Sequence, residues 1–347
     1  MARSYLDWNA TTPLRAEARQ AMIEAMDVVG NPSSVHSEGR AAKALMERAR
    51  AQVAAALGAE GQDVIFTSGA TEAAALALGG REVHCAGVEH DAIRSWCVED
   101  LPVDRAGRIT VTDPANSALQ LANSETGVVQ ELPEGLYLSD LTQGFGKIPF
   151  AFNWLGTTCG IVSAHKLGGP KGVGALIVKR GTDIAAQLKG GGQEMGRRAG
   201  TENLIGIAGF GAAAEAASRD LEGGIWREIE KLRNILENAI ADRASETIFV
   251  GNESHRLPNT SCFITPGWKG ETQVMQMDLG GFAVSAGSAC SSGKVKSSAA
   301  LVAMGFSETE AGSALRVSLG PQSREEDVMR FAEHWLKCEA KHRARRG

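Results

Sequence analysis

Two amphipathic segments open the chain. Apolar residues recur every three or four positions after Pro13, which predicts a helix over residues 14–28. A second helix is predicted over residues 37–57, because the same spacing continues there and Gly58 supplies the glycine that often follows a helix end. Both helices precede the first strand-like segment of the chain.

Short apolar runs then predict a series of strands. In the first half of the chain these runs cover residues 63–67, 83–88, 118–122, 136–138, 160–163 and 175–178. Helical segments lie between several of the runs, and continuous apolar runs are typical of strands buried on both faces. We therefore expect an α/β fold in which a mostly parallel, mixed sheet is sandwiched by helices.

The pattern changes after a long helix predicted over residues 225–244. Short helices then alternate with strands predicted over residues 247–250, 261–265, 282–285 and 315–318. A last helix is predicted over residues 324–341. We expect a large domain over residues 16–225 and a smaller α+β domain built from residues 1–15 and 226–347.

Composition and charge indicate a globular protein and exclude several other classes. Hydrophobic residues make up 43% and charged residues 22% of the chain, and the net charge of −5 gives no reason to expect direct nucleic-acid binding. The N-terminus lacks the apolar core of a secretory signal. The longest uncharged stretch, residues 148–164, is too polar to span a membrane. The six cysteines include no Cys-x-x-Cys pair, so we expect no metal site and a cytoplasmic protein with reduced thiols.

The most informative segment surrounds Lys166. This lysine follows the strand predicted over residues 160–163 and precedes a turn with glycines at 168, 169, 172 and 174. Its amine can bond covalently to a cofactor aldehyde there, because the glycines leave room for a cofactor beside the backbone. A loop lysine taken alone is more often simply solvated, so the interpretation depends on the neighbouring motifs.

Two residues at strand ends, and one three residues after a strand, can surround an aromatic cofactor. Asp140 ends a predicted strand, where its carboxylate can pair with a protonated pyridine nitrogen, and Gln143 can hydrogen-bond a ring hydroxyl. His90, also at a strand end, can stack on the ring. Taken alone, Asp140 would be read as a helix cap and His90 as a capping or core histidine.

A phosphate site is predicted between a strand and a helix. The N–H groups of Ala70 and Thr71 lie at the start of the helix after residues 63–67, where helix N-termini favour anions. Ser163 and His165, beside Lys166, can add further donors.

A cysteine and an arginine in the last third of the chain complete the candidate chemistry. Cys290 lies among serines and glycines, and Lys294 and Lys296 can favour its thiolate form. The alternative is a buried structural thiol. Arg316 lies in a strand-like run, where an inward-facing guanidinium would need an anion such as a carboxylate; the alternative is the solvent face of an edge strand.

With these residues assembled, the sequence resembles cysteine desulfurases of the NifS/IscS type. These are fold-type-I pyridoxal-phosphate enzymes related to class-V aminotransferases. The resemblance runs nearly end to end and is carried by residues 5–13, 31–36, 67–72, 163–174, 190–194, 198–203, 288–290 and Arg316.

The resemblance implies pyridoxal 5'-phosphate as cofactor, bound covalently by Lys166 in the large domain. It implies further cofactor contacts from His90, Asn123, Ser124, Asp140 and Gln143 around the ring, and from Ala70, Thr71, Ser163 and His165 at the phosphate. Thr201 would reach the phosphate of the partner subunit, which implies a homodimer with shared sites.

The resemblance also implies the reaction. Asn31 and Arg316 would bind the carboxylate of L-cysteine. Cys290, carried by a loop of the small domain, would attack the substrate sulfur and keep it as a persulfide, with release of L-alanine; the catalytic residues would be Cys290, Lys166 and His90. The sulfur would pass to an acceptor, for example an iron–sulfur scaffold protein.

Other readings of the same residues stay open. A selenocysteine lyase, or another enzyme of the same fold, would use most of them. An aminotransferase would have no use for a thiol at Cys290. A non-catalytic binding module of this fold is the alternative from a different class, because fold alone does not prove activity.

The sequence departs from the pattern of the family in three ways. Ala74 and Ala75 stand where two asparagines are usual, and Ser124 stands where an asparagine is expected to contact the ring. The chain is also shorter than is usual. The shortening is greatest over residues 79–122 and 130–138, where we expect trimmed or missing crossover helices.

Overall fold

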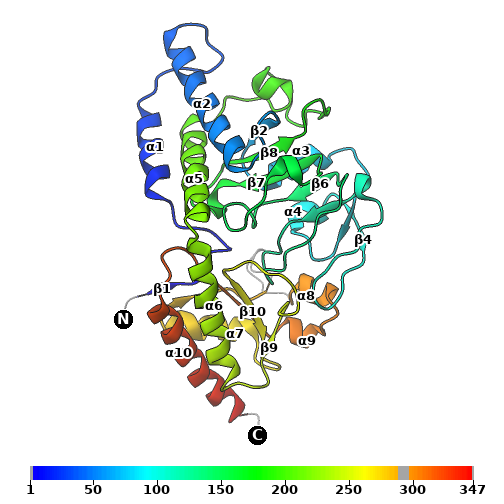
Figure 1. Cartoon of the computed structure of the whole chain (residues 1–347), viewed down its shortest axis with the longest axis vertical. Helices are drawn as coiled ribbons and strands as arrows, with labels where there is room; N and C mark the ends of the chain where they lie inside the picture. Colours follow the sequence, from blue (N-terminus) through cyan, green and yellow to red (C-terminus); the bar gives the residue numbers. More distant parts are fainter. Residues whose placement is uncertain (1–2, 288–296, 346–347) are drawn as a thin grey trace.

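The computed structural model describes residues 3–287 and 297–345. The chain forms a large α/β part and a smaller α+β part, one above the other in Figure 1. Helix α5 (Leu204–Glu222) belongs to the large part and leads directly into α6 (Ile225–Ala241) of the small part. Gly224 between them has φ 76°, a conformation that favours glycine, so the chain can change direction at this point.

A five-stranded mixed sheet forms the centre of the large part. Its strand order is β2 (Asp63–Thr67), β8 (Gly174–Val178), β7 (Cys159–Ser163), β6 (Leu138–Asp140) and β5 (Ala118–Gln120). Strand β8 is antiparallel to both of its neighbours, whereas β5, β6 and β7 are parallel to one another. Four of the five strands therefore run the same way, which confirms the predicted mostly parallel, mixed sheet.

The run predicted as a strand over residues 83–88 is shorter in the structure. Strand β3 (His84–Ala86) pairs in parallel with β4 (Val98–Leu101), and α4 (Asp91–Arg94) connects them. A single parallel bridge between His84 and Ser117 joins this pair to the edge of the main sheet. Hydrophobic patterning could not reveal β4, because this strand is mostly exposed and polar.

Helices cover both faces of the main sheet, as predicted. Helices α1 (Ala16–Met26), α2 (Ser37–Ala56) and α5 pack on one face, and α3 (Ala70–Leu78) packs on the other. Strand β2 shows the alternation that this requires: Val64 and Phe66 enter the core under α2 and α5, while Ile65 enters the core under α3.

The connections at one edge of the sheet are reduced, also as predicted. Between β4 and β5 there is one short 3₁₀ helix (Pro114–Asn116), and residues 121–137 between β5 and β6 contain no helix. A largely apolar cavity of about 390 Å³ lies beside this connection and is lined by Leu121, Val129, Leu132 and Trp154 among others; Trp154 is 89% exposed. Further 3₁₀ turns cover Phe152–Trp154, Ala164–Lys166 and Gln193–Gly196.

The small part is built on a three-stranded antiparallel sheet. Its order is β12 (Ala314–Ser318), β10 (Thr260–Ile264) and β9 (Ile248–Phe249). The remaining elements are the parallel pair β1 (Ser4–Tyr5) and β11 (Phe282–Ala283), and the helices α7 (Gly270–Leu279), α8 (Ala299–Ala303), α9 (Glu308–Ala311) and α10 (Glu325–Arg343). A core around Trp268, Phe331 and Trp335 holds this sheet against α6 and α10.

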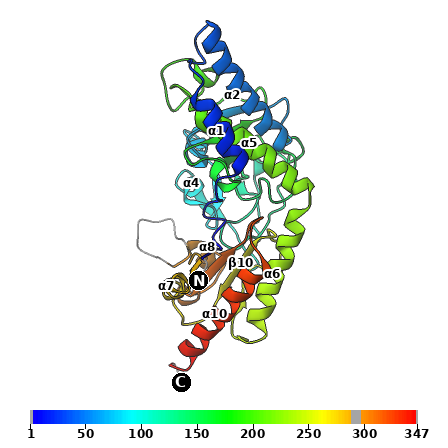
Figure 2. The same ribbon diagram turned by 90° about the vertical axis from the view of Figure 1, so that its left-hand side faces the viewer.

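Figures 1 and 2 place the connection between α1 and α2 at the end of the molecule opposite to the small part. Among the described residues, no helix is long and apolar enough to cross a membrane. The separate cores of the two parts support the predicted division of the chain, whose boundaries stay a prediction.

Candidate active site

The residues predicted to bind a cofactor meet at one edge of the main sheet. Lys166 follows β7, Asp140 ends β6, and Ala70 follows β2. Because these strands run in the same direction, their carboxyl ends lie along a single edge, which is where ligands bind in open α/β sheets. His90 follows β3 on the same side, because β3 bridges in parallel to the residue before β5.

The start of α3 fits a phosphate group. The first-turn N–H groups, including those of Ala70 and Thr71, lie where a helix has no acceptors of its own. A Cβ added to Gly69 would lie 3.9 Å from Ser163 Oγ, so the Ser163 hydroxyl faces the same backbone. A Cβ added to Gly174 would lie 2.7 Å from Gly69. Only glycine at position 174 therefore lets β8 approach the backbone at the start of α3 this closely.

His165 is a neutral donor or acceptor at this site. Its Nδ1 lies 3.1 Å from Thr11 Oγ1. Burial, and then the positive charges of Lys166 and Lys171, lower the pKa of His165 to about 4. The imidazole therefore contributes hydrogen bonds rather than charge near neutral pH.

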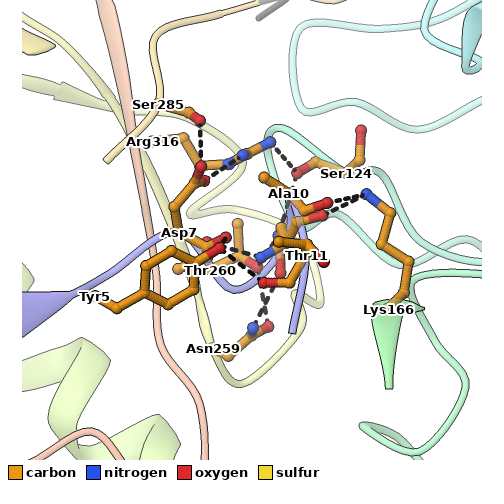
Figure 3. Close-up of polar contacts among 12 residues, drawn as sticks. Tyr5, Asp7, Ala10, Thr11, Ser124, Lys166, Asn259, Thr260, Ser285 and Arg316 are labelled. Carbon is orange, nitrogen blue, oxygen red and sulfur yellow. Dashed lines mark hydrogen bonds and ion pairs between the residues drawn. The ribbon is translucent and has the colours of Figure 1, made fainter. Parts of the chain in front are cut away.

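Lys166 directs its amine toward the N-terminal strap, by which we mean residues 4–12. Its Nζ donates to the main-chain oxygens of Asn9 at 2.6 Å and Ala10 at 3.0 Å. Figure 3 shows the Lys166 amine directed toward Ala10. The Thr12 hydroxyl donates to the main-chain oxygen of Lys166 at 2.8 Å. The strap thus fixes both the backbone and the amine of the predicted cofactor lysine.

The other ring-contacting candidates are also ordered by hydrogen bonds. Asp140 Oδ1 accepts the N–H of Thr142 at 2.9 Å, and the buried Gln143 donates from Nε2 to the Asn9 main-chain oxygen at 3.0 Å. His90 is exposed, and its Nδ1 accepts the N–H of Ala92 at 3.0 Å at the start of α4. His90 therefore keeps an accessible ring next to the site.

Asn123 and Ser124 shape the backbone around the site. The Asn123 side chain is buried; its oxygen accepts the N–H of Thr126, and its nitrogen donates to the main-chain oxygen of Val88. The main-chain oxygen of Ser124 accepts a hydrogen bond from Arg316. Their predicted direct contacts with the cofactor stay a prediction.

Arg316 is a buried cation with donors left over. Its side chain is 9% exposed; Nη2 donates to Asp7 Oδ1 at 2.7 Å, and Nη1 donates to the Ser124 main-chain oxygen at 3.1 Å. Its buried Nε has no hydrogen-bond partner among the described residues. Ser285 Oγ donates to the other oxygen of Asp7 at 2.9 Å (Figure 3). A buried guanidinium held this way can donate hydrogen bonds to a further carboxylate.

Asn31 and Thr201 are not brought to this cluster within one chain. Both are exposed, and the Asn31 side-chain oxygen accepts the N–H of Ser33 at 2.9 Å. Asn31 belongs to the connection between α1 and α2, which lies at the far end of the molecule from β10 and its neighbour β12, the strand that carries Arg316. Joint action of Asn31 and Arg316 would thus require a second copy of the chain.

The loop that carries Thr201 is anchored by a buried carboxylate. Glu194 accepts hydrogen bonds from both terminal nitrogens of Arg50, at 2.7 and 2.9 Å, and from the N–H of Phe66. Glu194 has φ 47°, a left-handed conformation that is unfavourable for a non-glycine residue. These contacts hold the loop in a strained turn.

Cys290 lies outside the described residues. The described positions on either side of it are bonded to residues close to Arg316. Ser285 bonds Asp7, and the Ser298 hydroxyl donates to Glu125, whose pKa is raised by burial. The described residues before and after Cys290 in the sequence therefore contact residues that lie near Arg316.

Sequence reasoning missed several residues that hold the site together. Asp7 and Asn9 lie in the N-terminal motif that carries the resemblance, but neither was given a role there. Lys147 has one weak signal, its position four residues after Gln143. No feature of the sequence points to the buried Glu89, whose pKa burial raises well above the usual range.

Comparisons with known proteins identify the family and the fold. The family model described as "Aminotransferase class-V" matches residues 4–331. The cysteine desulfurase IscS of Dictyoglomus turgidum is 36% identical over 360 residues, which cover 93% of this chain and 91% of that protein.

Solved structures of similar proteins have the same fold. A NifS-like protein from Rickettsia africae superposes with a TM-score of 0.88 at 31% identity, over 96% of this chain and 99% of that one. A structure described as SspA in complex with cysteine gives a TM-score of 0.76 at 25% identity, over 92% and 99% of the two chains. The predicted fold class is confirmed. The chain belongs to the class-V aminotransferase family and, within it, to the cysteine desulfurases of the NifS/IscS type.

Proposed function

We propose that this chain removes sulfur from L-cysteine, using pyridoxal 5'-phosphate, and releases L-alanine. The observation that carries the proposal is the N-terminal strap, which contacts the amine of Lys166 at one end and the guanidinium of Arg316 at the other. A free amino acid offers an amino group and a carboxylate at a fixed short separation. Lys166, through the cofactor, and Arg316 are suited to these two groups.

The residues present fit the cofactor. Lys166 would hold its aldehyde carbon, the start of α3 with Ser163 would hold its phosphate, and Asp140 would face its ring nitrogen. When bound, the cofactor supplies an electron sink that stabilises negative charge at the substrate Cα. Gln143 would donate to the ring oxygen, and His90 would lie against the ring.

Arg316 would orient the substrate through its remaining donors. The substrate carboxylate would bind the side of the guanidinium that includes Nε, since Asp7 and Ser124 occupy other positions. In one of the similar structures, SspA is described as a complex with cysteine.

Cys290 would receive the sulfur. Its thiolate sulfur would bond to the substrate sulfur while the substrate carbon–sulfur bond breaks. The electron pair of that bond would stay with the carbon, which takes up a proton and becomes the methyl group of L-alanine. The sulfur acceptor that follows, for example an iron–sulfur scaffold protein, stays a prediction, as does the cytoplasmic location.

A homodimer with shared sites would unite the separated residues. Asn31 and Thr201 lie in exposed loops, as expected if they complete the site of a partner. Exposed apolar side chains lie in the connection that carries Asn31 and in the end of α1 before it: Ile23, Met26, Val29 and Val35. Sedimentation of the purified protein as a monomer at micromolar concentration would remove this part of the proposal.

Product analysis with a cysteine variant tests the proposed reaction. The wild-type protein should release L-alanine and sulfide in equal amounts from L-cysteine with a thiol reductant. Cys290→Ala should bind the cofactor but release no sulfide, whereas Cys97→Ala, a half-buried control, should behave as wild type. Full sulfide release by Cys290→Ala would reject the persulfide step. Turnover of L-selenocysteine alone, by both wild type and Cys290→Ala, would favour a selenocysteine lyase.

A further inference from the structure

Lys147 is a buried lysine whose place in the molecule the proposed reaction does not explain. It is 4% exposed and follows Gln143 by four residues. Burying a lysine is costly, and in soluble proteins such a residue is normally paired with a carboxylate. In the described part of the chain its charged neighbours are Lys166 and Arg316, both positive. A structural ion pair therefore does not account for this residue.

Both hydrogen bonds of Lys147 go to side-chain oxygens of amides. Its Nζ donates to Gln143 Oε1 at 2.6 Å and to Asn9 Oδ1 at 3.3 Å. A carboxamide presents an acceptor on one side and donors on the other, so a donor at the oxygen fixes which way the group faces. With its oxygen on Lys147, Gln143 must direct its nitrogen away from Lys147 and toward the strap.

The strap oxygen that receives this nitrogen also receives Lys166. The main-chain oxygen of Asn9 accepts Gln143 Nε2 at 3.0 Å and Lys166 Nζ at 2.6 Å. Figure 3 shows the oxygens of the strap turned toward the Lys166 amine. A continuous series of hydrogen bonds therefore leads from Lys147 through Gln143 to the atom that holds the cofactor lysine.

The Asn9 side chain is fixed by hydrogen bonds to residues other than Lys147. Its Nδ2 donates to the Ser124 main-chain oxygen at 3.1 Å and to Thr260 Oγ1 at 2.8 Å, and its Oδ1 accepts Asn259 Nδ2 at 3.0 Å. All polar atoms of the Asn9 side chain are bonded. Asn9 therefore gives Lys147 a fixed second acceptor, and the movable partner is Gln143.

We propose that Lys147 is a positioning residue that fixes the carboxamide of Gln143 with its N–H groups toward the cofactor ring and Lys166. The inference rests on the proposed function, in which Gln143 donates to the ring oxygen. One N–H of Gln143 bonds the strap, and the other is left for that oxygen. Without Lys147 the carboxamide can turn and present its own oxygen to the ring oxygen, which repels it.

The electrostatic surroundings support a donor rather than a counter-ion. Burial lowers the pKa of Lys147 well below its ordinary value, and the positive charges of Lys166 and Arg316 lower it further. Lys147 makes two donor contacts, both to side-chain amide oxygens. Lys147 therefore acts as a hydrogen-bond donor that orients the amides of Gln143 and Asn9.

The test is a pH titration of the absorbance of the cofactor bound to Lys166 in Lys147→Met holoenzyme. A donor at the ring oxygen favours the deprotonated form of the lysine-bound cofactor, so its loss should raise the titration midpoint, by about one pH unit for one charge-assisted hydrogen bond. The dissociation constant of pyridoxal 5'-phosphate from the same variant should rise about tenfold by the same reasoning. Lys171→Met, which removes an exposed positive charge near His165, is the matched control and should leave the midpoint unchanged.

A second pair of variants tests whether Lys147 acts through Gln143. In a Gln143→Met background, Lys147→Met should cause no further shift. If Lys147→Met does not fold, Lys147→Gln is used in its place. Because glutamine keeps a donor, Lys147→Gln should shift the titration midpoint less than Lys147→Met would. This smaller shift should also vanish in the Gln143→Met background.

Two results overturn the proposal by itself. These are an unshifted midpoint in Lys147→Met, and an equal shift with and without Gln143. A wild-type protein that gains no lysine-bound absorbance would instead overturn the proposed function, and this inference with it.

Discussion

The ion pair between Asp7 and Arg316 connects the N-terminal strap to β12 and holds the arginine proposed to bind the substrate carboxylate. The two charged side chains are 17% and 9% exposed, and Ser285 donates to the second carboxylate oxygen of Asp7. The variant Asp7→Asn keeps the volume of the side chain and an oxygen for Arg316, but it removes the negative charge. It therefore isolates the electrostatic part of this contact.

The structure sets the size of the effect. Opposite charges about 4 Å apart attract by about 4 kcal/mol near a protein surface, and breaking a buried ion pair costs about 3–5 kcal/mol. Since asparagine keeps one hydrogen bond and Asp7 is partly exposed, we expect Asp7→Asn to lower the free energy of unfolding by about 2–3 kcal/mol. Arg316, relieved of its counter-ion, should also bind a carboxylate ligand such as L-alanine more tightly.

The assay is urea unfolding of the cofactor-free protein, followed by tryptophan fluorescence, together with L-alanine titration of the holoenzyme. Asp278→Asn is the matched control: it removes the same charge from an exposed ion pair with Arg3, and it should change stability by less than about 1 kcal/mol. An Asp7→Asn protein as stable as this control, with unchanged affinity for L-alanine, would refute the assigned role of the ion pair.

Three further variants test other parts of the site. Lys166→Ala should abolish the absorbance of the lysine-bound cofactor, and a surviving band would move the cofactor to another lysine. Burial and nearby positive charges lower the pKa of His165 from 6.5 to about 4, so between these pH values His165 is protonated in the unfolded chain but not in the folded one. The free energy of unfolding should therefore fall as the pH drops from 6.5 to 4. His165→Gln should weaken this pH dependence in thermal melts. Glu194→Gln should cost about 3 kcal/mol in urea unfolding, because Arg50 loses its buried partner, while Glu47→Gln, which alters the exposed partner of the same arginine, should cost much less; equal losses would contradict the anchoring role of Glu194.

The main elements could be predicted from local sequence because their signals are local. The buried strands β2, β7 and β8 are continuous apolar runs. The shortening predicted over residues 130–138 agrees with the absence of a helix before β6. Strand β4 could not be predicted, because it is polar and is defined by its pairing with β3.

The candidate site was only partly predictable. The motifs at Lys166 and Asp140 each follow a strand, so their meeting at one sheet edge follows from topology. The role of Asp7 depends on an ion pair across 309 positions of sequence, and that of Lys147 depends on burial beside Asn9. Neither contact leaves a periodic or compositional signal in the chain.

The central claim is tested most directly by the absorbance of the purified protein, supplied with pyridoxal 5'-phosphate, before and after addition of L-cysteine with a thiol reductant. L-alanine and sulfide are measured in the same sample. The account predicts a lysine-bound cofactor band that changes with L-cysteine, together with equal amounts of L-alanine and sulfide. A protein that gains no band with added cofactor and forms neither product would contradict it and would favour a binding module of the same fold.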